Sequence, residues 1–292
     1  MSIDRVAVTG GNGKIGERIL SGFNDHGYET VDVARGKRRE EVSDEYRTTD
    51  LLDPGEVYGS LAASDADAVV HMGTIPSPVS HPEHVTFESN VMTTYHVAEA
   101  ATALGLEAVV FASSINAIGA DYQEEPADVR YLPVDEEHPV TPRDPYGLGK
   151  HAAEVVGDGF GRRSGTPQMA SLRYPWVATD EELRRRFGAA DRSLDAFASS
   201  GGRTGNTLFT YLHMEDAVSV ARRAVEADFE GHEVFWTVAA DTSVETPTPR
   251  LVEEFYADAE VREPLEGHDS LISVEKARDL LDWEPEHSWR DA

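Results

Sequence analysis

A glycine-rich turn near the start of the chain most constrains how it can fold. The apolar residues 6–8 predict a buried strand, and residues 17–20 have the spacing of a helix. Between them glycine occupies every third position, at Gly10, Gly13 and Gly16. A strand, a glycine-rich turn and a helix in this order are typical of a dinucleotide-binding site. A glycine-rich loop without a ligand is the alternative interpretation.

Each glycine has a separate role in the dinucleotide interpretation. Gly10 lets the chain turn sharply, Gly13 lets the backbone approach a pyrophosphate, and Gly16 lets the helix pack closely on the strand. The first N–H groups of the helix have no partner within it and face the phosphates. We therefore predict cofactor contacts from this loop at the following positions: Gly10, Asn12, Gly13, Lys14, Ile15 and Gly16.

Length and composition exclude several classes of protein. The 292 residues suffice for one large α/β domain, alone or with a smaller lobe. The absence of cysteine excludes disulfides, thiolate nucleophiles and cysteine metal sites. Because the sequence has no apolar run of membrane-spanning length and no export-signal pattern, we expect a cytoplasmic protein without membrane contacts. We also expect no metal, since His81 and His84 lack carboxylates in a fixed geometry.

The charge balance is strongly acidic. Asp and Glu total 54 against 26 Lys and Arg, for a formal net charge of −28. The acidic residues are spread along the chain, which favours adaptation to high salt over binding of a basic partner. In molar salt the Debye length falls to ~3 Å and the mutual repulsion is screened. We predict no nucleic-acid ligand, because phosphate backbones need clustered positive charge.

The end of the second predicted strand, residues 28–33, bears on the choice of cofactor. A carboxylate at this place binds the ribose hydroxyls of NAD, whereas an arginine can bind the 2′-phosphate of NADP. Here Ala34 and Arg35 follow the strand, with further basic residues at 37–39. We therefore favour NADP, with NAD as the alternative. Asp32 is the competing residue, since another register would place its carboxylate at the ribose.

Strands and helices alternate through the rest of the chain with short connections. Further strands are predicted at residues 66–73, 108–112, 169–173 and 234–238, and helices from about 54, at 88–104, at 146–161 and at 215–226. This alternation predicts an α/β fold with a doubly wound parallel sheet of the Rossmann type. We expect residues 1–173 to form the core, completed by 212–240, with a small C-terminal substrate lobe from 174–211 and 241–292.

Two short motifs place reactive side chains near the predicted site. Ser114 follows the strand at 108–112, at the carboxyl edge where parallel sheets bind ligands. Tyr146 and Lys150 are four residues apart and therefore share one face of a helix. Each motif alone is weak evidence, because serine pairs also form turns and the spacing Y-x-x-x-K also occurs by chance.

The combination of these motifs resembles the extended short-chain dehydrogenase/reductase family, which contains NAD-dependent epimerases and dehydratases. The motifs are the loop at 9–16, Asp50-Leu51, Asn90, Ser114 and Tyr146-x-x-x-Lys150, and the similarity extends to residues 209–216 and thus over nearly the whole chain. The resemblance implies that Tyr146 is the general base or acid, that Lys150 binds the nicotinamide ribose and that Ser114 contacts the reacting oxygen.

The resemblance also implies the composition of both binding sites and the assembly. Beyond the glycine-rich loop, cofactor contacts are expected from Ala34, Arg35, Asp50, Leu51, Met72, Gly73, Asn90, Tyr146, Lys150 and Tyr174. Substrate contacts are expected from Ser77, Ser114, Asn116, Tyr146 and Trp176. The protein is expected to be a homodimer or homotetramer, with contacts through the helices at 88–104 and 145–161.

Within the family, the stretch 113–119 and the compact length are most similar to uronate and aldose 1-dehydrogenases. These enzymes oxidise a free sugar to a lactone, so we predict oxidation at C1 of a pentose such as arabinose, of a hexose or of a uronate. Residues 173–176 depart from the uronate enzymes' pattern. A nucleotide-sugar 4-epimerase or dehydratase is the first alternative, and a cofactor-sensing regulator without activity is the second.

Overall fold

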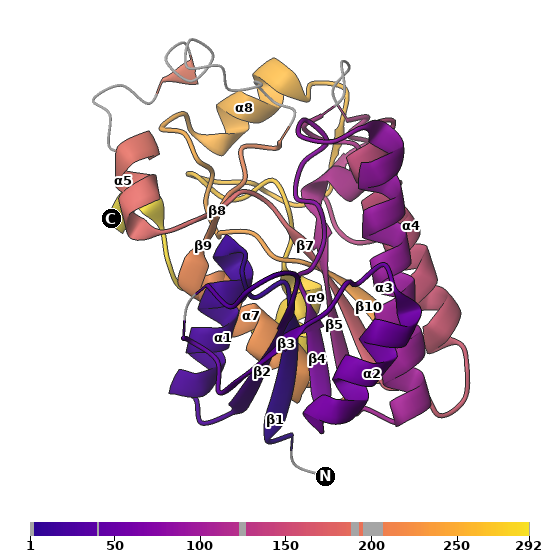
Figure 1. The fold of residues 1–292 in the computed structure, drawn as a ribbon. Helices are drawn as coiled ribbons and strands as arrows, with labels where there is room; N and C mark the ends of the chain where they lie inside the picture. Colours follow the sequence, from indigo (N-terminus) through magenta and orange to yellow (C-terminus); the bar gives the residue numbers. More distant parts are fainter. Residues whose placement is uncertain (1–2, 40, 123–126, 188–192, 195–206, 292) are drawn as a thin grey trace.

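A sheet of parallel strands forms the centre of the computed structural model, which describes residues 3–39, 41–122, 127–187, 193–194 and 207–291 (Figure 1). Within these ranges the sheet has seven strands in the order β10-β7-β5-β4-β1-β2-β3. Their bounds are β1 Arg5–Thr9, β2 Glu29–Ala34, β3 Glu45–Thr48, β4 Ala68–His71, β5 Ala108–Ser114, β7 Gln168–Tyr174 and β10 His232–Trp236. Because every neighbouring pair is parallel, the carboxyl ends of these strands share one edge.

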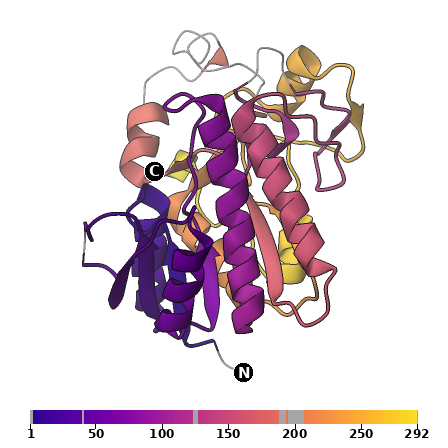
Figure 2. The same ribbon diagram turned by 45° about the vertical axis from the view of Figure 1, so that its right-hand side comes forward.

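Helices cover both faces of the sheet, which confirms the predicted Rossmann-type α/β fold. One face carries α1 (Lys14–Asp25), α7 (Met214–Glu226) and α9 (Glu275–Leu281). The other carries α2 (Pro54–Ser64), α3 (Glu83–Leu104) and α4 (Pro145–Gly161), and Figure 2 shows α3 and α4 side by side. A strand buried on both faces is apolar in its middle, as β1 illustrates: Val6 and Val8 belong to the core on the α1 side, and Ala7 belongs to the core on the α3 side.

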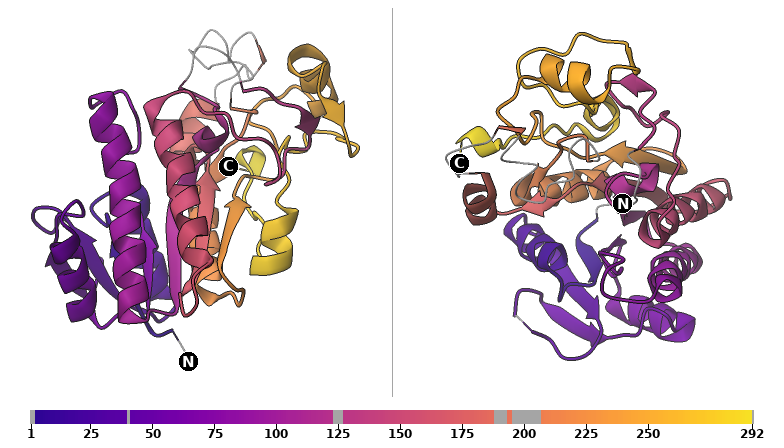
Figure 3. Two further views of the ribbon diagram at one scale, coloured as in Figure 1. Left: turned by 90° about the vertical axis from the view of Figure 1, so that its right-hand side faces the viewer. Right: turned by 90° about the horizontal axis from the view of Figure 1, so that it is seen from above.

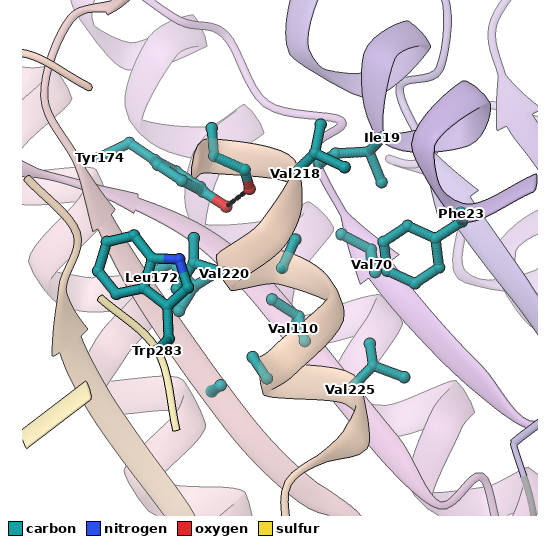
Figure 4. Packing of buried hydrophobic residues seen from close by; sticks show 14 of the residues in the cluster. Ile19, Phe23, Val70, Val110, Leu172, Tyr174, Val218, Val220, Val225 and Trp283 are labelled. Carbon is teal, nitrogen blue, oxygen red and sulfur yellow. Dashed lines mark hydrogen bonds between the residues drawn. The ribbon is translucent and has the colours of Figure 1, made fainter. Parts of the chain in front are cut away.

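The larger core fills the space between the sheet and the helices α1 and α7 (Figure 4). Ile19 and Phe23 are four residues apart on α1, and both are fully buried against Val70 of β4 and Val218 of α7. Truncating a buried phenylalanine to alanine generally costs ~3–5 kcal/mol of stability, because a cavity remains. Packing of this kind fixes the helix that follows the glycine-rich loop.

Three elements differ from the sequence-based expectation: β3, α9 and α3. Strand β3 (Glu45–Thr48) was not predicted, because this short edge strand is only partly buried and lacks apolar alternation. Helix α9 lies within residues 241–292, predicted to form the lobe, but its Ala277 and Leu281 pack on the main core with α7 and β10. Helix α3 also begins at Glu83 and not at residue 88.

The remaining elements lie beyond the carboxyl edge of the sheet (Figures 1 and 3). They are η1 (Ile115–Ile118), β6 (Tyr131–Leu132) paired with β11 (Glu260–Val261), β8 (Val177–Ala178) paired with β9 (Leu212–His213), α5 (Asp180–Phe187), α8 (Thr248–Phe255) and η2 (Trp289–Asp291). They have a core of their own around Leu132, Trp236 and Leu251. Residues 188–192 and 195–206 of the predicted lobe lie outside the described residues. Among the helices of the described ranges, none combines the length and apolar character needed to cross a membrane.

Candidate active site

A cavity of about 1100 Å³ opens at the carboxyl edge of the sheet. It is lined by the glycine-rich loop, the ends of β2, β4 and β5, the start of α4, the segment after β7 and the end of α5. All the residues predicted to bind cofactor or substrate line this cavity except Asn90 and Ser77. The parallel topology brings these segments together from distant parts of the sequence.

The glycine-rich end of the cavity fits a dinucleotide diphosphate. Gly10 has a φ of +73°, and a Cβ at this position would lie 2.7 Å from Gly73 Cα. A Cβ on Gly16 would overlap the carbonyl oxygen of Gly10. The N-terminus of α1 has no side chain capping it, so its first N–H groups are available to an anion at this end of the cavity. Glycine at both positions therefore lets the turn and the start of α1 pack directly against neighbouring backbone.

Asn12 connects the glycine-rich loop to the basic segment after β2. Its Nδ2 donates to the carbonyl of Arg35 at 3.3 Å, and its Oδ1 accepts from the N–H of Arg39 at 3.2 Å. Both arginines line the cavity. Arg38, also in the basic cluster, instead donates to Ser43 on the far side of the loop.

The structure places Ala34 and Arg35 at the cavity and keeps Asp32 away from it. Ala34 is the last residue of β2 and lines the cavity with Arg35. Asp32 lies two residues earlier in β2, and its carboxylate packs against Gly11. Burial raises the pKa of Asp32 to about 6, although the Gly11 N–H and the charge of Arg38 oppose the shift. In the observed register Ala34 and Arg35, and not Asp32, line the cavity.

Ser114 ends β5 and is positioned by Asn116 from the first turn of η1. The backbone N–H and the Nδ2 of Asn116 each donate to Ser114 Oγ at 3.2 Å. With both lone pairs occupied, the hydroxyl proton of Ser114 remains to be donated. The Oδ1 of Asn116 in turn accepts from the N–H of Asp121 at 2.7 Å, which ties the following loop to the same site.

Tyr146 and Lys150 enter the cavity from the first turns of α4. Asp144 caps the N-terminus of α4, since its Oδ1 accepts from the N–H groups of Tyr146 and Gly147 at 2.9 Å each. Pro145 occupies the first position of the helix. The two residues are four positions apart, and both side chains are buried. Lys150 Nζ lies 5.6 Å from the centre of the Tyr146 ring. The predicted pair is therefore on one helix face.

Burial shifts the pKa values of Tyr146 and Lys150 in opposite directions. It raises the pKa of Tyr146 above its ordinary value, and the hydrogen bond with Ser114 acts against the shift. It lowers the pKa of Lys150 to about 7, while the charge of Glu154 opposes the change. Lys150 Nζ donates to the carbonyl of Ala112 at 2.5 Å and to Thr74 Oγ1 at 3.0 Å. A phenol and an ammonium group thus share a desolvated site, an arrangement suited to proton transfer.

Sequence reasoning missed a buried ion pair below this site. Arg173 of β7 binds both carboxylate oxygens of Glu154, with Nε–Oε1 at 2.9 Å and Nη2–Oε2 at 2.8 Å. Ser113 Oγ donates to the same carboxylate at 2.6 Å. Glu154 lies one turn after Lys150 on the same helix face, and this spacing was the available signal. The pair fixes α4 against β7, and the hydrogen bond from Ser113 joins the same carboxylate to the end of β5.

A second missed network lies where β1 and β4 end. Thr9 Oγ1 accepts from the N–H of Gly73 at 3.1 Å and meets His71 Nδ1 at 2.7 Å, while His71 Nε2 meets Thr93 Oγ1 at 3.1 Å. Burial, reinforced by the charge of Lys150, lowers the pKa of His71 to about 3 and keeps it neutral. These hydrogen bonds connect β1 and β4 to α3, whose Thr93 lines the cavity.

Three predicted residues have observed contacts that do not point at the cavity. Asn90 binds the backbone of Ile75 twice, at 2.8 and 3.1 Å, and so fixes the loop after β4. Ser77 Oγ accepts from a neighbouring N–H in the same loop. Tyr174 lines the cavity, but its hydroxyl donates to the carbonyl of Ala217 at 3.2 Å (Figure 4). Direct contacts of these side chains with a ligand stay predictions.

Comparison with known proteins identifies the family. A putative UDP-glucose 4-epimerase of Methanocaldococcus jannaschii is 25% identical over 295 residues, covering 96% of this chain and 93% of that protein. The L-arabinose 1-dehydrogenase (NAD(P)(+)) of Haloferax volcanii is 29% identical over 231 residues, covering 76% and 83%. The solved structure of MoeE5 in complex with UDP-glucuronic acid and NAD superposes with a TM-score of 0.71 at 21% identity, covering 98% and 95%.

The family assignment rests on a match along most of the sequence. The model of the NAD dependent epimerase/dehydratase family matches residues 6–235, from the first strand to the last strand of the sheet. The matched region contains the glycine-rich loop, Ser114, Tyr146 and Lys150. The chain belongs to the NAD dependent epimerase/dehydratase family.

Proposed function

We propose that the protein is an NAD(P)-dependent dehydrogenase that oxidises a free aldose at C1 to the lactone. The observation that carries this proposal is that Ser114, Tyr146 and Lys150 line one cavity together with the glycine-rich loop. Such a site can take a proton from a sugar hydroxyl beside a bound dinucleotide. The L-arabinose 1-dehydrogenase from Haloferax volcanii is a relative with this chemistry in its name.

Tyr146 has the central role in the proposed reaction. A bound nicotinamide supplies the acceptor for the hydride from C1. The C1 hydroxyl gives its proton to the Tyr146 oxygen, while Ser114 donates a hydrogen bond to the reacting oxygen. A tyrosine that acts as base near pH 7 needs its pKa lowered by about three units from the ordinary value, or ~4 kcal/mol of preferential phenolate stabilisation. Tyr146 needs more than this, because burial raises its pKa in the protein without cofactor. The ammonium group of Lys150, 5.6 Å from the Tyr146 ring centre, provides part of that stabilisation.

We propose NADP as the preferred cofactor, because Arg35 lines the cavity next to Ala34 where a carboxylate would select NAD. Arg35→Ala should weaken NADP roughly 10- to 100-fold, the value of one charge-assisted contact, and leave NAD nearly unchanged. Ala34→Asp should also improve NAD, since the new carboxylate can accept from the ribose hydroxyls. Values of kcat/KM for both cofactors measure these effects. An equal loss for NAD and NADP in Arg35→Ala would show that this arginine does not bind the 2′-phosphate.

The second candidate is a nucleotide-sugar 4-epimerase, which the relative from Methanocaldococcus jannaschii favours over most of the chain length. A substrate screen separates the two. The wild-type protein in molar KCl is incubated with free aldoses and uronates, or with UDP-glucose, and with NAD or NADP. We expect reduced cofactor to accumulate with a free sugar. Conversion of UDP-glucose to UDP-galactose without any oxidation of free sugars would favour the epimerase.

We also propose a homodimer built on the outer face of α3 and α4. Four large apolar side chains on these helices are 38–51% exposed: Phe87, Met92, Leu148 and Val155. Light scattering in molar KCl should give twice the monomer mass of 32.0 kDa, and Val155→Asp should shift the protein toward the monomer. Val261→Asp, equally exposed on β11, is the control and should stay dimeric. A monomeric wild type would contradict the proposal.

A further inference from the structure

The ammonium group of Lys150 is held in the cavity by two acceptors from different segments. Its Nζ donates to the carbonyl of Ala112, in β5, at 2.5 Å and to Thr74 Oγ1, in the loop after β4, at 3.0 Å. All three residues line the cavity. An ammonium group has three N–H donors, and within the described ranges these two are its hydrogen bonds. The two acceptors therefore determine where the third donor points.

The two acceptors differ in how they depend on the sequence. Ala112 contributes a backbone carbonyl, which any residue at that position would provide. Thr74 contributes a side-chain hydroxyl, which a valine of nearly the same size would lack. The contact with Thr74 is therefore the part of this arrangement that the residue type specifies.

Thr74 lies on a segment whose backbone is fixed on both sides. Its own N–H donates to the carbonyl of Met72 at 2.9 Å, which closes a three-residue turn directly after β4. The next residue, Ile75, is bound at both its N–H and its carbonyl by the buried Asn90 of α3, at 2.8 and 3.1 Å. A hydroxyl on so well anchored a segment can hold a long lysine side chain at one position.

The surroundings of Lys150 give its charge little other support. Burial lowers the pKa of Lys150 to about 7, and the charge of Glu154 opposes this change. Glu154 is itself paired with Arg173 of β7. Burial also raises the pKa of Tyr146 and lowers that of His71, so these two neighbours are neutral near pH 7. Hydrogen-bond acceptors such as the Thr74 hydroxyl therefore stabilise the charged form of the lysine.

We propose that Thr74 is a positioning residue for the reaction, because its hydroxyl holds the Lys150 ammonium group charged and in place beside Tyr146. This inference rests on the proposed dehydrogenase function and adds a residue to its site. In that reaction the charge of Lys150 favours the phenolate form of Tyr146. Loss of the Thr74 acceptor should therefore slow the reaction without removing a contact to the sugar.

The variants Thr74→Val and Thr74→Ser separate the hydroxyl from the shape of the side chain. With a free aldose and saturating cofactor, Thr74→Val should lower kcat roughly 10- to 100-fold, the value of one hydrogen bond to a charged group, while the KM for the sugar changes by less than about threefold. Thr74→Ser keeps the acceptor and should stay within about threefold of the wild-type kcat.

A titration of Lys150 measures the same hydrogen bond without any turnover. The chain has four lysines, so NMR spectra of protein labelled with carbon-13 at lysine Cε contain few signals, and Lys150→Met identifies the one from Lys150. In the cofactor-free wild type this signal should report a pKa of about 7. In Thr74→Val it should titrate at least about one pH unit lower, because the charged form has lost an acceptor. Thr74→Ser should titrate like the wild type.

Thr102→Val is the matched control, because it removes a hydroxyl of α3 that has no hydrogen-bond partner among the described residues and does not line the cavity. It should change neither kcat nor the titration of Lys150. A shifted titration in Thr74→Val without oxidation of any free sugar would support the positioning role and refute the dehydrogenase. An unshifted titration, or a loss of kcat that Thr74→Ser shares, would overturn the role of Thr74 and leave the dehydrogenase in place.

Discussion

The Tyr146→Phe variant should lose at least ~100-fold in kcat while its affinity for the cofactor stays close to that of the wild type. The substitution removes the group that accepts the substrate proton but keeps the buried ring that packs against Tyr122 and lies near Lys150. The measurement is steady-state turnover together with cofactor binding by fluorescence titration. Binding should change little, because the phenol oxygen is one contact among many along the cavity.

Tyr95→Phe is the control for this experiment, since it removes the same atom from a ring that packs on Phe160 in the helical layer, away from the cavity. It should retain wild-type turnover. Near-normal kcat in Tyr146→Phe would refute the assignment of the proton acceptor. A loss of cofactor binding equal to the loss of turnover would instead assign Tyr146 to the dinucleotide site alone.

The Arg173→Met variant should lose ~3–5 kcal/mol in the free energy of unfolding, because it leaves Glu154 as an unpaired buried carboxylate. Both side chains of the pair are only 4% exposed. The double variant Arg173→Met, Glu154→Leu should recover much of this loss, since no charge then remains buried. Chemical denaturation in molar KCl measures the free energy of unfolding of the single and the double variant. A single-variant loss no larger than ~1 kcal/mol would contradict the account.

An exposed ion pair offers the comparison for this stability measurement. Arg223 and Asp282 meet at 3.3 Å with side chains 37% and 91% exposed, so Arg223→Met should change stability by less than ~1 kcal/mol. The buried pair also gives a pH signature. Desolvation of Glu154 is outweighed by Arg173, which with the other hydrogen bonds lowers the pKa of this carboxyl to about 2. Its stabilising contribution is therefore present above pH 4.5 and is lost as the pH falls toward 2.

The predictable parts of the site are those where the backbone requires a particular residue type or a particular spacing. The glycines at 10, 13 and 16 are needed where a Cβ would meet backbone, and Ser114 ends a strand whose carboxyl end the parallel topology places at the site. The spacing of Tyr146 and Lys150 follows from the period of a helix. The predicted loop, serine and tyrosine all line one cavity in the structure.

The parts that could not be predicted depend on tertiary contacts. The partner of Glu154 is 19 residues away on another element, and Thr74, which accepts from Lys150, is 76 residues away in the loop after β4. No periodicity relates such positions. Strand β3 was missed for a related reason, since its four residues pair with β2 at the edge of the sheet without an apolar pattern of their own.

The measurement that tests the central claim most directly follows the hydrogen on the sugar. The wild-type protein is incubated with an oxidised cofactor and a free aldose that carries deuterium at C1. The account predicts that the deuterium appears on the nicotinamide ring of the reduced cofactor, with one lactone formed for each cofactor reduced, and that Tyr146→Phe abolishes the transfer. No transfer from C1 of any free sugar, together with interconversion of UDP-glucose and UDP-galactose without net reduction of the cofactor, would contradict it.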